Sequence, residues 1–353
     1  MKKLLIINQS QFGYHLDTYY YCKYLKDDFD ITYICWDYVK KRIEMNKIDV
    51  KYVSRDGNLV IRNIRFIINV IKEIKNNKYN IHFIKYFRGC SVLKILFPLK
   101  NFIFDIRTSS PNKSKFRRSI YDKFMKFESK FYKNITIITE SLRNKLKIYK
   151  NKTFILPLGA DVISNKKREF NEMNLIYVGI LSNRNIEETI IGFEKFYKQN
   201  KQQTNMKYTI IGDGYYNEIE ELKMLVKEKG LDNVVEITGY VHHNDLEKYF
   251  DTHNIGISYV PKTEFFDVQP PTKTFEYLLS GMPVVATNTL ENVKVINSKN
   301  GVLIDDNSEG FYKGLIELNK SRKKYNSSTI TKSVEQYKWE SIVNNFKKYL
   351  EKI

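Results

Sequence analysis

Short runs of apolar residues recur along the chain, and segments with helical periodicity separate them. In the second half, "IEETIIGFEKFYKQ" (186–199) and "YNEIEELKMLVKEKG" (216–230) repeat apolar residues at intervals of three and four, which predicts helices. The apolar runs between such segments show no polar alternation, as is typical of strands in a parallel sheet that helices cover on both faces. In the second half these runs lie at 175–178, 208–211, 234–237, 255–259, 284–286 and 302–304.

The first half follows the same alternation, and the stretch "LPLGADVISNKKREFNEMN" (156–174) separates the two series. The sequence therefore predicts an α/β protein with two Rossmann-like, doubly wound domains, 1–165 and 166–335, that face each other across a cleft. In such sheets ligands bind at the carboxyl ends of the strands, near the position where the strand order reverses. In the first half the predicted strands lie at 4–8, 31–35, 50–53, 81–84, 102–106, 135–139 and 153–156, and the predicted helices at 15–26, 58–76, 115–132 and 141–149.

The composition fits this organisation. A chain of 353 residues with 42% hydrophobic content is long enough for two domains with cores of their own. The three cysteines, Cys22, Cys35 and Cys90, show no CxxC spacing, which argues against a disulfide framework or a zinc site and favours a reducing compartment. The N-terminus is apolar only over residues 4–7, which is too short for a signal peptide or for a span of about 20 residues. We therefore expect a cytoplasmic protein.

The charge is distributed unevenly. Residues 1–165 contain 33 Lys and Arg against 14 Asp and Glu, a net charge of +19, whereas residues 166–353 contain 26 of each kind. A general preference for lysine would have affected both halves. The asymmetry predicts an anionic partner for the first half, which could be a membrane surface, a phosphorylated substrate or a nucleic acid.

Two loops of the second half carry candidate binding residues. In "YTIIGDGYYNEIEEL" the glycines Gly212 and Gly214 follow a predicted strand, and glycine lets a ligand approach the backbone. Many α/β turns contain GxG without binding a ligand, so this motif alone is a weak indication. In "VGILSNRNIEETI" Arg184 follows the strand that ends near Gly179, where a guanidinium can pair with phosphate or remain solvated.

The stretch "DVQPPTKTFEYLLSGMPVVATNT" (267–289) places a helix directly after two prolines. We expect Thr272 to cap this helix, so that its first N–H groups favour an anion such as diphosphate, and Lys273 adds a full positive charge. Glu276 follows one turn later and can accept hydrogen bonds from two ribose hydroxyls. Alternatively, Glu276 only complements the helix dipole.

These motifs occur in an order and spacing that resemble the donor-binding domain of the retaining GT-B glycosyltransferases of glycosyltransferase family 4, in its Pro-x-Lys-x-x-Glu subgroup. The similar segments are "IYVGILSNRNIEETI", "IIGDGYYNEIEEL", "VVEITGYV" and "PPTKTFEYLLSGMPVVAT". "LPLGAD" resembles the inter-domain segment, and "YKWESIVNNFKKYLEKI" resembles the C-terminal helix (336–353) that crosses back to the first domain. The resemblance covers nearly all of residues 150–353. The first half matches mainly at "INQSQFGYHLDTYYYCKYL" and "FIFDIRTSS".

The resemblance implies a nucleoside-diphosphate-sugar donor, linked to UDP or GDP, and roles for individual residues. Arg184 and Lys273 would neutralise the departing diphosphate, and Asp105, with Arg107 nearby, stands where the family often has active-site residues. The donor would be bound by Glu276 at its ribose, by Gly212 and Gly214 along the nucleotide, by Tyr240 and Val241 at the base, by Thr272 and Thr274 on the helix, and by Gly13 in the first loop of the N-terminal domain.

The chain also departs from the family pattern. The first of the family's two glutamates, eight positions before Glu276, is Val268 here. Asp267 and Gln269 are the neighbouring polar candidates for contacts with the transferred sugar. The arginine often found directly after Gly179 is replaced by Ile180, so Arg184 would carry more of the phosphate charge.

The implied reaction is retaining transfer of a sugar to a saccharide or lipid-linked acceptor, in the synthesis of surface polysaccharide or glycolipid. It needs no metal, and the sequence has no DxD motif at a suitable position. Two other classes remain open. One is a nucleotide-sugar epimerase or glycosyl phosphorylase on the same scaffold, and the other is a basic nucleic-acid-binding protein, although no nucleic-acid-binding motif is present.

The segment "NKSKFRRSIYDKFMKFESKFYKN" (112–134) combines an apolar stripe with basic residues. One interpretation is a helix whose stripe faces the core and whose basic face is solvated. The other is a surface that holds the protein at the inner face of an anionic membrane. The stripe consists of Phe116, Ile120, Phe124, Phe127 and Phe131, and eight Lys or Arg lie between residues 113 and 133.

Overall fold

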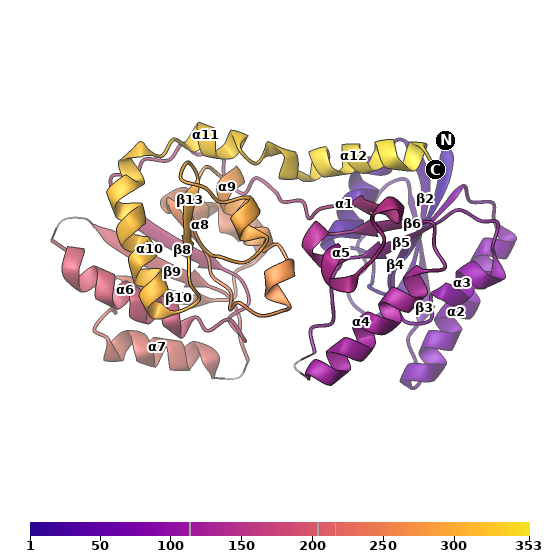
Figure 1. Ribbon diagram of the computed structural model, residues 1–353, viewed down its shortest axis with the longest axis horizontal. Helices are drawn as coiled ribbons and strands as arrows, with labels where there is room; N and C mark the ends of the chain where they lie inside the picture. Colours follow the sequence, from indigo (N-terminus) through magenta and orange to yellow (C-terminus); the bar gives the residue numbers. More distant parts are fainter. Residues whose placement is uncertain (113, 203–204, 216) are drawn as a thin grey trace. The chain divides into compact units, whose positions relative to one another are not determined.

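The computed structural model describes residues 1–112, 114–202, 205–215 and 217–353. The chain forms two compact units (Figure 1). Unit 1 contains Met1–Leu158 and Trp339–Ile353, and unit 2 contains Gly159–Lys338. The boundaries thus lie seven residues before the predicted 165/166 junction and three residues after the predicted 335/336 junction.

Unit 1 is built on a seven-stranded sheet with the order β3-β2-β1-β4-β5-β6-β7, in which every pair is parallel. The order reverses between β1 and β4, as in a doubly wound fold. The strands are β1 (Lys2–Ile7), β2 (Phe29–Asp37), β3 (Ile48–Ser54), β4 (Ile81–Lys85), β5 (Phe102–Ile106), β6 (Asn134–Ile137) and β7 (Thr153–Ile155). The helices are α1 (Leu16–Leu25), α2 (Leu59–Asn76), α3 (Ser91–Leu96), α4 (Lys115–Ser129), α5 (Glu140–Leu146) and α12 (Trp339–Glu351).

Unit 2 has a six-stranded parallel sheet with the order β10-β9-β8-β11-β12-β13, which reverses between β8 and β11. Its strands are β8 (Met173–Val178), β9 (Met206–Ile211), β10 (Val235–Gly239), β11 (Ile255–Ser258), β12 (Val284–Thr287) and β13 (Gly301–Ile304). Its helices are α6 (Glu187–Asn200), α7 (Glu218–Glu228), α8 (Leu246–Thr252), α9 (Thr272–Leu279), α10 (Ser308–Ser321) and α11 (Ser327–Lys332). Short 3₁₀ turns occur at Lys150–Lys152, His243–Asp245, Phe266–Val268, Asn292–Lys294, Arg322–Lys324 and Glu335–Tyr337.

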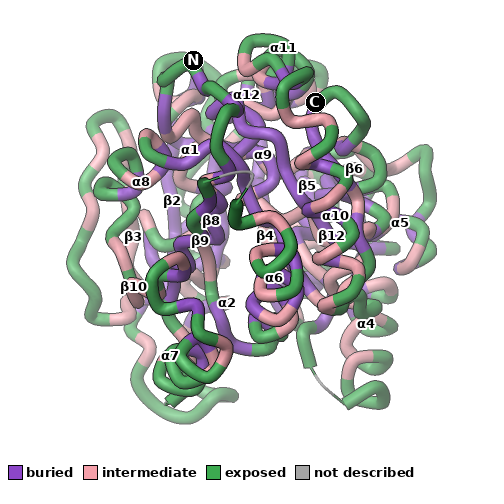
Figure 2. Tube along the Cα trace, turned by 90° about the vertical axis from the view of Figure 1, so that its left-hand side faces the viewer, coloured by how far each residue is buried: buried purple, intermediate pink, exposed green. Residues whose placement is uncertain are grey.

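The predicted α/β fold with two Rossmann-like, doubly wound units is confirmed. Each predicted strand corresponds to an observed one. The central strands of both sheets are buried on both faces and therefore appear as plain apolar runs, whereas the edge strands β3, β7 and β10 are only partly buried (Figure 2). The short helix α3 was not predicted, since six residues are too few to show a helical period. Within the described residues, no helix is long and apolar enough to cross a membrane.

The stripe of α4 does not face the core. The residues of α4 that are buried are Met125, Glu128 and Ser129. Phe116 is 74% exposed and Phe127 is 53% exposed, so the interpretation of a core-facing stripe is wrong. The helix is rotated so that Glu128 points inward, where its carboxylate accepts hydrogen bonds from the backbone N–H of Ser91 (3.0 Å) and from the Ser91 hydroxyl (2.8 Å).

The C-terminal helix α12 completes the core of unit 1. Its side chains Trp339, Phe346 and Leu350 are buried in the same cluster as β1, α1 and β2. The Trp339 ring stacks on Tyr20 of α1 with 4.6 Å between ring centroids. The fifteen residues Trp339–Ile353 therefore stabilise the unit that Met1–Leu158 begins.

We expect Trp339→Ala to lower the free energy of unfolding by about 3–5 kcal/mol, because it leaves a cavity where an aromatic side chain was buried. Urea unfolding would measure this change. The exposed neighbour on the same helix, Glu340→Ala, serves as the control and should change the free energy by less than about 0.5 kcal/mol. A similar small effect for both variants would show that α12 is not part of the core.

Candidate functional site

In unit 2 the loops after β8 and β9 are tied together at the carboxyl edge of the sheet. The Gly179 N–H donates to Ile211 O (2.9 Å), the Leu181 N–H to Asp213 O (2.8 Å), and the Gly212 N–H to Gly239 O of the next strand (3.0 Å). These bonds fix the loops beside the point where the strand order reverses. A doubly wound sheet binds its ligand at this position.

Gly212 and Gly214 are each next to atoms that leave no room for a side chain, but these atoms differ between the two positions. A Cβ at Gly212 would overlap the carbonyl oxygen of Gly179, so Gly212 allows the two loops to approach. A Cβ at Gly214 would overlap Glu218, whose carboxylate accepts a hydrogen bond from the Tyr215 N–H (2.7 Å). The glycine at 214 is thus explained by a local turn, whether or not a ligand lies beside it.

Helix α9 begins at the Pro-Pro corner, but not as the sequence suggested. Pro271 occupies the N-cap without a side-chain cap, and Thr272 is the first helical residue, so the predicted capping by Thr272 is wrong. The Thr274 hydroxyl lies 2.6 Å from Ser258 Oγ and donates to Asn292 Oδ1 (3.1 Å), and the residue is fully buried. Thr274 therefore joins α9 to β11 and faces the interior instead of a ligand.

Lys273 is a buried cation without a hydrogen-bond partner among the residues that the structure describes. Its Nζ lies 3.6 Å from the centroid of the Tyr177 ring, a cation–π contact. A Cβ at Gly179 would lie only 2.9 Å from this Nζ, so the absence of a side chain at Gly179 makes room for the lysine. Burial lowers the pKa of Lys273 well below its usual value, Arg184 lowers this pKa further, and Glu276 opposes the shift.

Arg184 belongs to the same cluster. Its guanidinium carbon lies 4.1 Å from the centroid of the Phe266 ring. Burial lowers the pKa of Arg184, while Tyr177 acts to raise it. Arg184 thus disfavours the charged form of Lys273, and an anion beside the two groups would favour it.

Glu276 lies one turn further along α9 and is partly buried. Burial and then the neighbouring Asp161 raise the pKa of Glu276 to about 7, and Lys273 opposes this shift. Within the described ranges, its carboxylate oxygens accept no hydrogen bond from the protein. An unused acceptor pair beside two cations fits a ligand that offers hydroxyl groups next to an anion.

The segment before α9 places Val268 and its two polar neighbours, Asp267 and Gln269, in different surroundings. Val268 is buried in the core. Asp267 accepts a hydrogen bond from the Leu290 N–H (2.8 Å) and so holds a neighbouring turn. Gln269 Nε2 is buried and has no partner among the described residues, which leaves Gln269 as the free polar group of the three.

The two residues expected at the base lie in the loop after β10. Tyr240 is 70% exposed, whereas Val241 is half-buried against the core of unit 2. The exposed ring of Tyr240 leaves room for a flat ligand group beside the backbone of Val241. The structure places both residues at the carboxyl edge of the same sheet as Gly212.

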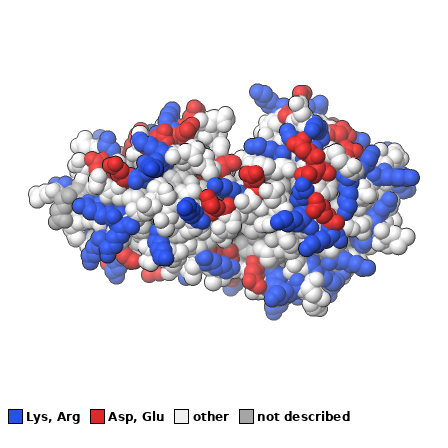
Figure 3. All heavy atoms as spheres, turned by 90° about the horizontal axis from the view of Figure 1, so that it is seen from above, with Lys and Arg blue, Asp and Glu red and all other residues white. Residues whose placement is uncertain are grey.

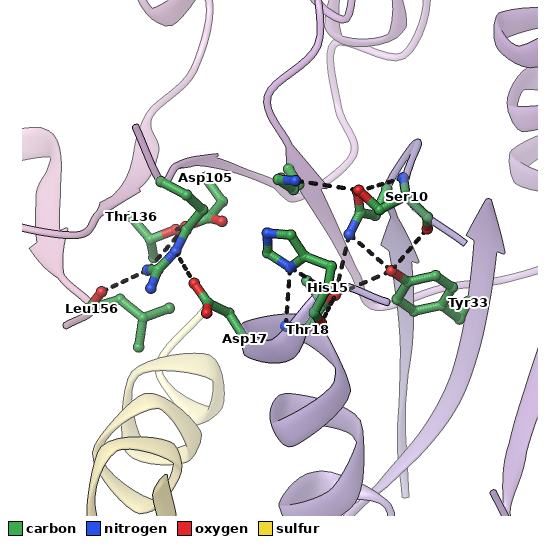
Figure 4. A network of polar contacts seen from close by, with 11 residues as sticks. Ser10, His15, Asp17, Thr18, Tyr33, Asp105, Thr136 and Leu156 are labelled. Atoms are coloured by element: carbon green, nitrogen blue, oxygen red, sulfur yellow. Dashed lines mark hydrogen bonds and ion pairs between the residues drawn. The ribbon is translucent and has the colours of Figure 1, made fainter. Parts of the chain in front are cut away.

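In unit 1 the loop after β1 contains Gly13, whose φ of +86° suits glycine. A Cβ at Gly13 would lie within 3 Å of the Ile43 side chain, so packing also excludes a larger residue. The loop is held by Asn8 Nδ2, which donates to Thr18 Oγ1 (3.1 Å) and to the Tyr33 hydroxyl (2.8 Å) (Figure 4).

Asp105 is fully buried and accepts a hydrogen bond from Thr136 Oγ1 (2.7 Å). Arg107 lies between Asp105 (3.9 Å) and Asp17 (2.5 Å), and it also donates to Leu156 O (2.6 Å) (Figure 4). Burial raises the pKa of Asp105 to about 6, against the effect of Arg107. The carboxylate of Asp105 therefore faces Arg107 and Thr136 in the interior of unit 1, and its expected part in catalysis stays a prediction.

Sequence reasoning missed three residues of this edge: His15, Asp17 and Lys85. Lys85 ends β4, and burial lowers its pKa to about 8. Burial, followed by the charge of Lys85, lowers the pKa of His15 to about 3, which leaves the imidazole neutral at physiological pH. A lysine at the end of a buried strand was the one signal that could have pointed to this cluster.

No group of three or more His, Cys, Asp or Glu that could hold a metal ion occurs within the described residues.

Residues 172–321 match the family described as glycosyl transferases group 1. No curated protein matches the sequence. Among solved structures, HepE of Anabaena in complex with UDP is similar over all of both chains, with a TM-score of 0.77 and 12% identity. Sucrose-phosphate synthase of Thermosynechococcus elongatus has a TM-score of 0.76 and 13% identity, over 100% of this chain and 99% of that one. The lipopolysaccharide outer core galactosyltransferase WaaB has a TM-score of 0.75 and 13% identity over all of both chains.

We expect Glu276→Gln to raise the free energy of unfolding at pH 8 by about 1–3 kcal/mol in the absence of ligand. The pKa of Glu276 in the folded state, about 7, lies above the usual value of 4.5, so stability is lost as the pH rises between these values. Glutamine mimics the neutral acid and avoids that loss. Urea unfolding at pH 4.5 and pH 8 would measure the difference, which should shrink to a few tenths of a kcal/mol at the lower pH.

The exposed Glu221→Gln on α7 is the matched control and should show no such pH dependence. Equal stability of Glu276→Gln and the wild type at pH 8 would mean that the carboxylate is not desolvated.

Proposed function

Since the chain is a group 1 glycosyltransferase with the GT-B fold, we propose that it transfers a sugar from a nucleoside-diphosphate sugar to a saccharide or lipid-linked acceptor. One observation carries the proposal: the unpartnered Lys273 lies beside Arg184, with the unused carboxylate of Glu276 one turn away. A nucleoside diphosphate offers both missing partners, an anion for the cations and ribose hydroxyls for the carboxylate. The similarity to a structure bound to UDP makes UDP the first nucleotide to test.

The diphosphate is the part of the donor on which catalysis depends. When the bond between the anomeric carbon and the diphosphate oxygen breaks, negative charge develops on the diphosphate. Lys273 and Arg184 would stabilise this charge, because preorganised positive charge is an effective form of catalysis. They can supply the charge that a metal ion supplies elsewhere, and we therefore propose a metal-independent reaction.

The acceptor hydroxyl would form the new bond on the face from which the diphosphate leaves, and its proton would pass to a diphosphate oxygen. The configuration at the anomeric carbon is then retained. This scheme uses no carboxylate as nucleophile or base, which agrees with the burial of Asp105 in unit 1. Asp105 and Arg107 would hold the loops at the carboxyl edge of the sheet in unit 1, where we propose that the acceptor binds.

Gln269 would take over the contact with the transferred sugar. It directly follows Val268, which is in the core, and its buried Nε2 has no partner among the described residues. An amide can donate to one sugar hydroxyl and accept from another. In unit 2 the exposed ring of Tyr240 and the backbone at Val241 would meet the base.

The acceptor side of the reaction would belong to unit 1. The excess of positive charge in residues 1–165 supports an anionic acceptor or an anionic membrane surface, with the protein bound peripherally. Gly13 and the neutral His15 lie in the first loop of this unit. A sugar could come close to the backbone at Gly13 and form a hydrogen bond with the uncharged imidazole of His15. Products of this class contribute to surface polysaccharide or glycolipid.

The donor roles can be separated with two variants. Lys273→Met should weaken UDP binding by about 10- to 150-fold, the range for a charged hydrogen bond of about 1.5–3 kcal/mol, but should leave the binding of uridine unchanged. Glu276→Gln should weaken both ligands, because both contain the ribose. Calorimetric titration with UDP, GDP and uridine would test this, with the exposed Glu221→Gln as the control. If the wild type binds no nucleotide, the proposed donor site is wrong.

The affinity for UDP-glucose should rise by about tenfold from pH 6 to pH 8. The pKa of Glu276 is about 7, and only the ionised carboxylate accepts two hydroxyl hydrogen bonds, so binding below that pH must first remove a proton. The diphosphate diester of UDP-glucose does not titrate in this range, so the change in affinity comes from a group of the protein. Titration calorimetry of the wild type and Glu276→Gln at both values provides the measurement, and a rise that persists in Glu276→Gln would assign it to another group.

A further inference from the structure

Exposed apolar side chains are concentrated on three helices of unit 1. Among the residues that the structure describes, 26 large hydrophobic residues are exposed by more than a third, of which 14 lie between residues 59 and 131 and six lie in unit 2. Unit 2 is the larger of the two, so size does not explain the difference. The 14 residues are Leu59, Val60, Ile61, Ile64 and Ile68 on α2, Val92, Ile95, Leu96 and Leu99 on and after α3, and Phe116, Ile120, Phe124, Phe127 and Phe131 on and after α4.

These helices share one face of the sheet. The connections β3-α2-β4, β4-α3-β5 and β5-α4-β6 all step in the same direction across the sheet, whereas β1-α1-β2 steps the other way. Because such crossovers are right-handed, α2, α3 and α4 lie on the face opposite to α1, on which α12 packs.

The outer side of α4 is basic as well as apolar. Its two acidic residues both face the protein: Glu128 is bound to Ser91, and Asp122 accepts from the Ser110 N–H (3.0 Å). Arg117, Lys123 and Lys130 are exposed beside the phenylalanines. On the face seen in Figure 3, by contrast, Lys and Arg lie next to Asp and Glu on both units.

A cavity of about 480 Å³ opens at the start of α4. Arg88 and Arg117 line it, and none of its lining residues is acidic. The Arg88 guanidinium lies 4.9 Å from the centroid of the Tyr121 ring, which also lines the cavity and holds the arginine in place. Ile120 belongs both to the cavity wall and to the apolar stripe, so the two features are continuous.

We propose that this face of unit 1 docks on a membrane of anionic phospholipid, with a lipid phosphate bound between Arg88 and Arg117 and the acyl region against the apolar side chains of α2, α3 and α4. A bilayer is the partner that offers phosphate and hydrocarbon together. A nucleic acid offers phosphate but gains nothing from exposed Leu and Ile. The inference builds on the proposed anionic surface for unit 1 and adds its lipid-binding site.

Co-sedimentation of the full-length protein with vesicles tests the proposal. Vesicles of phosphatidylcholine with one third phosphatidylglycerol should bind the wild type at least about tenfold more tightly than pure phosphatidylcholine. The double variant Arg88→Gln, Arg117→Gln should lose most of this preference, and Phe124→Ser, Phe127→Ser should weaken binding by about tenfold or more. Lys198→Gln, Lys223→Gln on unit 2 removes the same charge from exposed positions and should bind like the wild type.

Each variant is checked by its melting temperature and by its affinity for UDP, both of which should be unchanged, so that failure here is distinguishable from failure of the donor site. Equal binding to both vesicle types, or an equal loss in the charge-matched control, would overturn the lipid site. A stable dimer in light scattering that the phenylalanine variants dissociate would also overturn it, because a second copy would then cover the face.

Discussion

The carboxyl edge of the sheet in unit 2 is built around one buried amine, Lys273 Nζ, that has no hydrogen-bond partner among the described residues. This amine lies over the Tyr177 ring, in space that Gly179 leaves open, and Gly212 lets the two neighbouring loops approach each other. Burial disfavours the charged form of Lys273, and the neighbouring Arg184 adds to this effect. The strand order, the two glycines and the Pro-Pro corner together place this amine at the carboxyl edge of the sheet.

The sequence was sufficient to predict the elements that burial determines. All thirteen strands were visible as apolar runs, because parallel strands are covered on both faces and need no alternation. The grouping of Arg184, Lys273 and Glu276 was also accessible, since each residue directly follows a strand or begins a helix at the same sheet edge. In a parallel sheet, the loops that follow the strands lie at the same edge, so residues directly after the strands can be expected to lie near one another.

Side-chain direction could not be predicted in the same way. Thr274 and Thr272 are two residues apart on α9, yet Thr274 bonds to Ser258 in the interior and Thr272 does not cap the helix. The stripe of α4 has the spacing of a core face but is exposed, because the inward position belongs to Glu128 and its bonds to the next loop. The carboxylate of Asp105 points into the interior, where it accepts a hydrogen bond from Thr136. In each case a long-range hydrogen bond decides the direction, and local periodicity does not contain it.

The position of α12 has a consequence for how the chain is made. Trp339, Phe346 and Leu350 belong to the core of unit 1, although they follow all of unit 2 in the sequence. Unit 2 is therefore synthesised in full before the core of unit 1 can be completed, and domains generally fold as units during synthesis. The apolar surface of α1 stays uncovered until α12 has been made. Any delay or failure in the synthesis of unit 2 thus leaves unit 1 without part of its core, so that unit 1 depends on unit 2 through the order of the chain.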